Sequence, residues 1–115
     1  MRRGEIWTMS GGDHYASKAR PAVIVQDDQF EHTKSITVCP LTTNTAEAPL
    51  FRLLVELNED NGLRVPSRLM VDKLVSLSRT KMGVRIGSLD AEDMLRLNRA
   101  IVVFLGLASG VRRAG

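Results

Sequence analysis

Apolar and polar positions follow two different periods along the chain, one in the first two-thirds and another in the last third. In the first part, short apolar runs rich in β-branched residues alternate with polar turns, a pattern that is typical of β-strands. The predicted strands cover residues 5–9, 22–26, 35–41, 51–57, 67–72 and 82–86. Alternate positions within residues 35–41 are expected to face opposite sides of a sheet. Asn61-Gly62 is a strong turn signal after the fourth strand.

The last third of the chain predicts one amphipathic helix. Its apolar positions recur at spacings of three and four residues, at Met94, Leu97, Ile101 and Leu105. Asp90 is suited to cap the first turn, because an aspartate there can accept hydrogen bonds from free backbone N–H groups, and Gly106 is suited to end the helix. Residues 102–104 widen the apolar face, which predicts either a subunit interface or deep burial within one subunit.

Five to seven short strands followed by one helix predict a mainly β fold of the α+β type. We expect a small, strongly curved antiparallel sheet or barrel with the C-terminal helix packed on it. A length of 115 residues predicts a single domain that spans residues 1–115.

The composition indicates in which cellular compartment the protein is expected. The chain has one cysteine, Cys39, so it cannot form an internal disulfide, which is typical of a reducing compartment. No apolar run approaches the length of a membrane span, and no apolar run follows Arg2 and Arg3 as in a signal peptide. We therefore expect a cytoplasmic protein without a membrane partner.

The net charge and the absence of several sequence motifs limit the partners and cofactors that we expect. A net charge of +3 is compatible with a polyanionic partner. The sequence has no zinc-ligand spacing, no P-loop and no dense carboxylate cluster, so neither a metal nor a cofactor is expected. If such a protein cuts phosphodiesters, the substrate should be RNA, since its internal 2′-hydroxyl can serve as the nucleophile.

Residues that suit phosphate chemistry stand at the ends of predicted strands. Arg20 precedes a buried strand, and the planar donors of arginine match phosphate oxygens two at a time. Residues 42–45 (Thr-Thr-Asn-Thr) follow the third strand and offer hydroxyl and amide donors. A simpler interpretation exists for each: Arg20 pairs on the surface with Asp27 or Glu5, and the Thr/Asn cluster serves only in a turn.

Other side chains could transfer protons. His14 lies in a Gly-rich loop, and an imidazole that titrates near neutral pH can act as general acid or base. Asp72 stands at a strand end, where its carboxylate could take a proton from a ribose hydroxyl. The simpler interpretation of Asp72 is an ion pair with Lys73 or Arg68, which shares its strand face.

Several segments, taken in order, resemble the MazF/PemK (Kid) toxins of bacterial toxin–antitoxin systems. Residues 3–7 (Arg-Gly-Glu-Ile-Trp) are similar to the opening of these toxins, and residues 20–25 (Arg-Pro-Ala-Val-Ile-Val) to their second strand. Residues 39–44 (Cys-Pro-Leu-Thr-Thr-Asn) resemble their third strand and the threonine that ends it. Residues 71–79 and 86–90 resemble the next diagnostic segment and the entry to the last helix.

The resemblance implies an SH3-like barrel or curved sheet with a C-terminal helix, assembled as a homodimer that binds a cognate antitoxin. It implies metal-independent, sequence-selective cleavage of single-stranded RNA, mostly messenger RNA, into 2′,3′-cyclic phosphate and 5′-hydroxyl ends. The catalytic arginine and threonine of the family fall on Arg20 and Thr42, with His14, Asp72 and Glu5 at further catalytic positions whose roles as acid or base stay open. The candidates for RNA contacts are Lys18, Thr43, Asn44, Arg68 and Arg79.

Two alternatives belong to other functional classes. Gyrase poisons of the CcdB type share this fold and bind a protein without cutting anything. They resemble one another in a C-terminal Trp-Gly-Ile tail, and residues 111–115 of this chain do not contain that sequence. A non-catalytic RNA-binding barrel is the other alternative, and it would bind RNA with strong salt dependence and give no product.

Overall fold

The computed structural model describes residues 1–10, 19–44, 46, 48 and 50–109. The strands are β1 (Glu5–Ser10), β2 (Ala19–Ile24), β3 (Ser35–Thr42), β4 (Arg52–Val55), β5 (Ser67–Met70), β6 (Val75–Ser78) and β7 (Met82–Ser88), and the α-helix is α1 (Ala91–Phe104). Single turns of 3-10 helix lie at η1 (Asp28–Phe30), η2 (Val71–Lys73) and η3 (Arg79–Lys81). In these described residues, no helix has the length and apolar character needed to cross a membrane.

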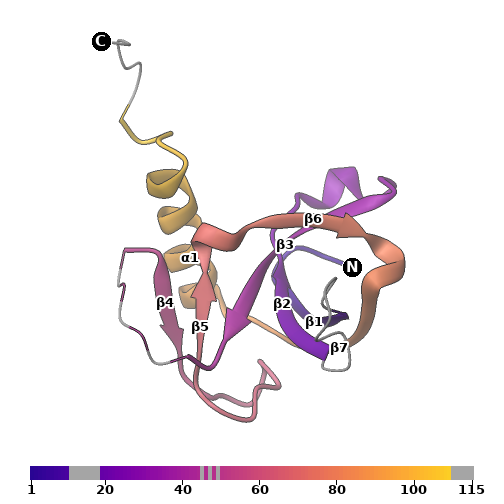
Figure 1. Cartoon of the computed structure of the whole chain (residues 1–115), viewed down its shortest axis with the longest axis horizontal. Coiled ribbons are helices and arrows are strands. Elements are labelled where there is room, and N and C mark those ends of the chain that lie inside the picture. The colour runs from indigo at the N-terminus through magenta and orange to yellow at the C-terminus, as the bar shows by residue number, and fades with distance from the viewer. Residues whose placement is uncertain (11–18, 45, 47, 49, 110–115) are drawn as a thin grey trace.

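The strands of the described residues form one antiparallel, strongly curved sheet in the order β4-β5-β3-β2-β1-β7, and β6 pairs with β3 beside this path (Figure 1). The sheet does not close, so the curved sheet is observed and the closed barrel is not. The long strand β3 explains the curvature. One edge of β3 pairs with β6 near Ser35 and with β5 near Thr42, which turns the two halves of the sheet in different directions.

Two apolar clusters cover the two faces of the sheet. The larger cluster packs α1 against β3, β4 and β5 and includes Cys39, Leu41, Leu69 and Leu97. The smaller cluster fills the inside of the curve and includes Ile24, Ile36 and Val38, with Trp7 and Met82 packed against it. The expected alternation along β3 is therefore confirmed, because its even and odd positions enter different clusters.

The helix begins and ends as the sequence predicts. The Asp90 side chain accepts a hydrogen bond from the backbone N–H of Asp93 at 2.8 Å, and Gly106 has a positive φ of 76° just past the helix end. Arg3 fixes the helix to the sheet, since its guanidinium donates to the Val25 carbonyl and the Asn98 side chain at 2.8 and 2.7 Å.

The end of the helix is exposed. Val103 is 59% exposed and Leu105 54% exposed, so the deep burial considered from the sequence is wrong for this end of α1. Phe104 is 46% exposed and keeps one neighbour, Phe51, with ring centroids 6.2 Å apart.

Two strand predictions needed correction. The strand predicted over residues 67–72 ends at Met70, and the chain turns into η2 at Val71. The strand β6 was not predicted, although Val75 and Leu77 alternate with serines, because a run of only four residues is a weak signal.

Candidate functional site

A cleft of about 370 Å³ opens where β2 and β3 separate, and it is lined by Ala19, Arg20, Pro21, Leu41, Thr42 and Thr43. The ladder between these strands runs from Ile24 to Ala22, and Ala22 pairs with Pro40. Beyond this pair the β2–β3 ladder ends, while on its opposite edge β3 still pairs with β5 through Leu41 and Thr42. Pro21 and Pro40 flank the opening, and neither has a backbone N–H with which to extend the ladder.

Arg20 and Thr42 lie on opposite walls of this cleft. Continuing the β2–β3 register by two residues would set them opposite each other, and both line the cavity although the ladder has ended. The side chain of Arg20 is exposed. The surface pairing considered from the sequence is not found among the described residues, because Glu5 pairs with Arg85 and Asp27 accepts from the backbone N–H of Gln29.

Thr42 is held by a turn, and among the described residues its hydroxyl proton has no acceptor. Its Oγ1 accepts a hydrogen bond from the backbone N–H of Asn44 at 3.1 Å, and the Asn44 side chain in turn accepts from Ala46 N–H at 2.8 Å. Thr42 therefore takes part in a turn and also lines the cleft, so the two interpretations that the sequence offered for it are compatible. A hydroxyl that accepts from the backbone can still donate to an anion in the cleft.

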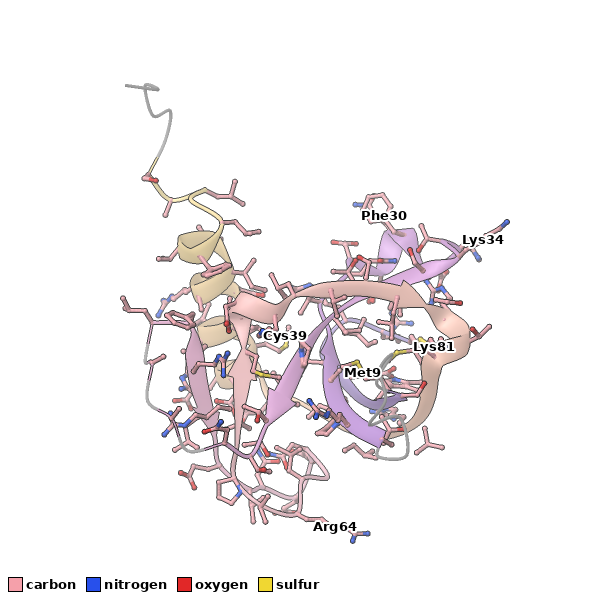
Figure 2. The ribbon with its side chains drawn as sticks, viewed as in Figure 1. Met9, Phe30, Lys34, Cys39, Arg64 and Lys81 are labelled. Atoms are coloured by element: carbon pink, nitrogen blue, oxygen red, sulfur yellow. The ribbon has the colours of Figure 1, made fainter. Side chains whose placement is uncertain are left out.

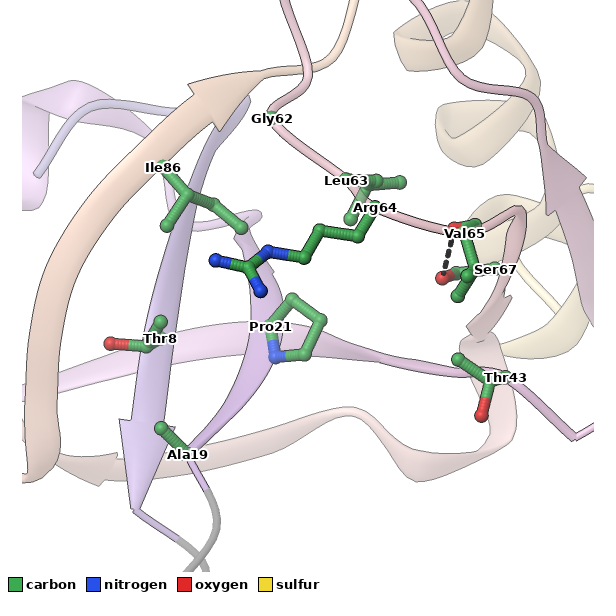
Figure 3. Close-up of a pocket in the computed structure, with 10 residues that line it drawn as sticks. All are labelled: Thr8, Ala19, Pro21, Thr43, Gly62, Leu63, Arg64, Val65, Ser67 and Ile86. Atoms are coloured by element: carbon green, nitrogen blue, oxygen red, sulfur yellow. Dashed lines mark hydrogen bonds between the residues drawn. The ribbon is translucent and has the colours of Figure 1, made fainter.

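A second cleft, of about 440 Å³, continues from the first and shares Ala19, Pro21 and Thr43 with it (Figure 3). Its remaining walls come from β1, β7 and residues 62–67, and Arg64 reaches across it. The sequence interpretation missed Arg64. A basic residue between the Asn-Gly turn and the next strand was the available signal, since loop residues between rigid elements often carry function.

Asp72 is bound in an ion pair on the far side of β3 from Arg20. Its carboxylate accepts from Arg52 Nε at 2.7 Å and from Nη2 at 2.9 Å. Both side chains are mostly buried, with 18% of Arg52 and 22% of Asp72 exposed. The guanidinium holds the pKa of Asp72 below its usual range. The ion pair considered from the sequence does form, but the partner is Arg52 and not Lys73 or Arg68.

Strand spacing separates this pair from the cleft. Arg52 belongs to β4, and β5 and β3 lie between β4 and the Arg20 strand. Asp72 itself follows β5, which is two strand intervals of about 4.8 Å, or roughly 10 Å, from the strand of Arg20. The structure therefore does not bring Asp72 to Arg20.

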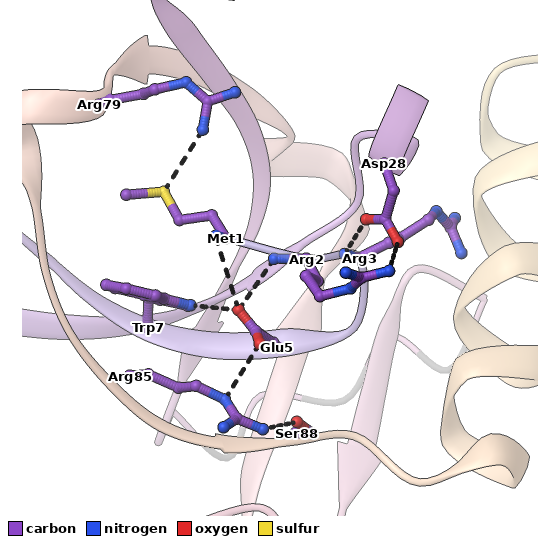
Figure 4. Close-up of polar contacts among 9 residues, drawn as sticks. All are labelled: Met1, Arg2, Arg3, Glu5, Trp7, Asp28, Arg79, Arg85 and Ser88. Carbon is purple, nitrogen blue, oxygen red and sulfur yellow. Dashed lines mark hydrogen bonds and ion pairs between the residues drawn. The ribbon is translucent and has the colours of Figure 1, made fainter. Parts of the chain in front are cut away.

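Glu5 is also bound by neighbours, at the other end of β1 (Figure 4). Its Oε1 accepts from the Trp7 indole and the Arg2 backbone, both at 2.9 Å, and its Oε2 lies 3.3 Å from Arg85 Nε. Burial pushes the pKa of Glu5 upward, but the hydrogen bonds and the positive charges outweigh burial and leave the pKa below its ordinary value. Glu5 is four residues from Met9, which pairs with Arg20, or roughly 13 Å along the strand.

The predicted RNA-contact residues fall in different places. Thr43 lines both clefts. Arg68 pairs with Thr42 across the β3–β5 ladder, and its guanidinium donates to the Arg52 carbonyl at 3.4 Å. Arg79 is away from the clefts, where it donates to the carbonyls of Thr33 and Phe30. His14 and Lys18 lie outside the described residues.

Cys39 is buried beneath the sheet near Asp72. Burial, together with the negative charge of Asp72, raises the pKa of the thiol to about 12 despite a hydrogen bond with the Met70 backbone. A thiol in this state is not a nucleophile at neutral pH.

Comparison with known proteins finds one family and several relatives. The family model for the PemK-like, MazF-like toxins of type II toxin–antitoxin systems matches residues 2–105. The chain is 44% identical over 108 residues to a probable endoribonuclease MazF of Mycolicibacterium smegmatis, covering 94% of this chain and 99% of the relative. It is 31% identical over 118 residues to endoribonuclease MazF9 of Mycobacterium tuberculosis, covering 95% and 99%.

Solved structures share the fold. The Mycobacterium tuberculosis toxin MazF-mt6 aligns with a TM-score of 0.74 and 27% identity, covering 89% of this chain and 96% of that chain. An endoribonuclease from Mycobacterial species, solved in complex with its cognate antitoxin, aligns with a TM-score of 0.76 and 23% identity, covering 93% and 96%.

Proposed function

The chain belongs to the family of PemK-like, MazF-like toxins of type II toxin–antitoxin systems, and we propose that it is an endoribonuclease that cuts single-stranded RNA, mostly messenger RNA. The observation that carries this proposal is the open cleft with Arg20 and Thr42 on its walls. Relatives that match nearly the whole chain and are named endoribonucleases support it.

Arg20 and Thr42 act on the phosphate in this proposal. Arg20 binds two oxygens of the scissile phosphate and stabilises the negative charge that grows as the 2′-oxygen attacks the phosphorus. The Thr42 hydroxyl donates to the same phosphate. The bond from phosphorus to the 5′-oxygen breaks, which leaves a 2′,3′-cyclic phosphate on one fragment and a 5′-hydroxyl on the other. The attacking hydroxyl supplies the nucleophile, so no metal-bound water is required.

Proton transfer is assigned to His14. A general base works best when its pKa lies near the working pH. Asp72 and Glu5 each have a lowered pKa and are bound to arginines, so both are weak bases. Histidine titrates near neutral pH without any perturbation. His14 stands six positions before Arg20 in the sequence and lies outside the described residues.

The proposal includes partners and a compartment. A cognate antitoxin covers the RNA cleft, in line with the solved endoribonuclease–antitoxin complex of similar fold. The chain assembles as a homodimer, and the exposed apolar residues at the end of α1 support this. Its RNA substrate puts the protein in the cytoplasm.

Cleavage of a long single-stranded RNA in EDTA tests the proposal. We expect the wild-type protein to release fragments with cyclic-phosphate ends, and we expect Arg20→Ala to abolish cleavage while its circular dichroism and melting temperature stay unchanged. Lys34→Ala is the matched control, because Lys34 is exposed and remote from the cleft and its loss also removes one positive charge. Normal cleavage by folded Arg20→Ala would reject the mechanism. Intact RNA with the wild-type protein would favour the gyrase-poison or RNA-binding alternatives.

A further inference from the structure

The second cleft is built for a flat, mostly apolar ligand. Pro21, Leu63, Val65 and Ile86 supply apolar walls, and the hydroxyls of Thr8 and Ser67 stand at its margin (Figure 3). These hydroxyls are already engaged, since Thr8 Oγ1 accepts from Val84 N–H at 2.9 Å and Ser67 Oγ donates to the Val65 carbonyl at 3.0 Å. The cleft therefore offers apolar contact, hydroxyls at its margin that include that of Thr43, and the guanidinium of Arg64.

Arg64 extends over this cleft. Its guanidinium lies between Ile86 and Pro21 and makes no hydrogen bond with the other residues that line the cavity (Figure 3). The side chain is exposed and reaches away from its own backbone. A planar cation above an apolar floor fits a nucleobase, because bases stack on guanidinium planes and accept hydrogen bonds on their edges.

The loop that carries Arg64 is fixed in place. The buried side chain of Asn61 donates to the Glu56 carbonyl at 2.8 Å and accepts from Leu63 N–H at 3.1 Å. Gly62 has a φ of 68°, and a Cβ there would meet the Ile86 carbonyl oxygen at 1.9 Å. Arg64 therefore starts from a backbone position that β7 determines, and a rigid support of this kind favours selective recognition.

We propose that this second cleft is a nucleobase pocket and that Arg64 determines which base it accepts. The inference rests on the proposed endoribonuclease function and deepens it. The two clefts share three wall residues, so a strand whose phosphate lies between Arg20 and Thr42 can place a neighbouring base against Pro21 and beneath Arg64. Arg20 and Arg64 both lie along the course of this strand, and their positive charges complement the negative charge of RNA.

Mapping cut sites in a random single-stranded RNA library tests the pocket. We expect Arg64→Ala to cut more slowly, since one positive charge on the RNA path is lost, and to lose base preference at one position beside the cut by about fivefold or more. Arg64→Lys keeps the charge and loses the planar fork, so it should cut well and still lack the preference. Lys34→Ala should retain the wild-type preference, since Lys34 and Arg64 lie at opposite ends of the molecule (Figure 2).

A binding experiment distinguishes a failure of this inference from a failure of the proposed function. Strands from the same library that bind an Arg20→Ala protein are sequenced, and the double variant with Arg64→Ala is treated in the same way. Enrichment of a base at one position that disappears in the double variant supports the pocket, even if the wild-type protein cuts nothing. The same enrichment in both proteins, or no enrichment in either, overturns it and leaves the cleft for a protein partner. An unchanged cut-site preference in Arg64→Ala also overturns it.

Discussion

Asp72, which the family resemblance implied as a catalytic residue, is engaged by Arg52 in an ion pair. The two side chains form a bidentate pair that is largely shielded from water. Arg52 also offers its carbonyl to Arg68, so the pair supports the strand next to Thr42. Removing one partner of such a pair leaves the other charge without compensation, which costs more than the pair itself contributes. Asp72 therefore supports the sheet beside the cleft.

We expect Asp72→Asn to lower the free energy of unfolding by about 1–3 kcal/mol at pH 7. The lowered pKa of Asp72 determines the pH range over which the two proteins differ in their free energy of unfolding. The stabilisation is complete above the unfolded-state pKa of about 3.9 and is lost as the pH falls through the lower native value. Urea unfolding of both proteins between pH 7 and pH 3 measures the difference.

Exposed Asp60 provides the control, since Asp60→Asn makes the same chemical change without an ion pair in the described residues. At a temperature where all three proteins are folded, we expect Asp72→Asn to cut RNA at close to the wild-type rate. A folded and inactive Asp72→Asn protein would contradict this prediction and indicate that Asp72 acts as a base in the reaction.

Among the secondary-structure elements, the early end of the β2–β3 ladder creates the cleft. The sequence predicts β3 and its alternation because the apolar positions repeat with period two, and it predicts α1 because both its cap and its stop are local signals. The point at which β2 and β3 separate depends on contacts between distant strands, and no local pattern encodes it. Arg20 and Thr42 could therefore be selected from strand ends, whereas the partner of Asp72 and the role of residues 62–67 could not.

The loop between β4 and β5 depends on one glycine for both its conformation and its fit. Gly62→Ala combines an unfavourable positive φ with a clash against the Ile86 carbonyl. We expect it to lower the free energy of unfolding by about 2 kcal/mol or more. Gly106→Ala is the matched control, because Gly106 also has a positive φ and open space around it, so only about 1 kcal/mol is expected there. Equal losses in thermal unfolding of the two variants would mean that the clash is relieved by movement of β7.

At the scale of the whole molecule, the sheet buries its apolar residues on both faces while the end of the helix stays uncovered. Val102, Val103 and Leu107 are 39%, 59% and 69% exposed. A cavity of about 410 Å³ lies among Asn98, Arg99, Val102, Val103 and Ala108. Clustered apolar exposure of this kind marks interaction surfaces, and a second copy of the chain is the occupant that the proposed homodimer provides.

Val103→Lys tests whether this surface joins two chains. A lysine near the end of α1 suits the helix dipole, so the fold should persist, but an ammonium buried between two subunits has no partner and costs several kcal/mol. We expect sedimentation velocity to show two chains of 12.7 kDa for the wild type and one chain for Val103→Lys. Leu95→Lys is the control, because Leu95 is 49% exposed at the other end of the same helix, and this variant should remain dimeric. A Val103→Lys dimer as tight as the wild type would place the subunit interface on another face, and a dimer broken by Leu95→Lys alone would place it at the start of α1.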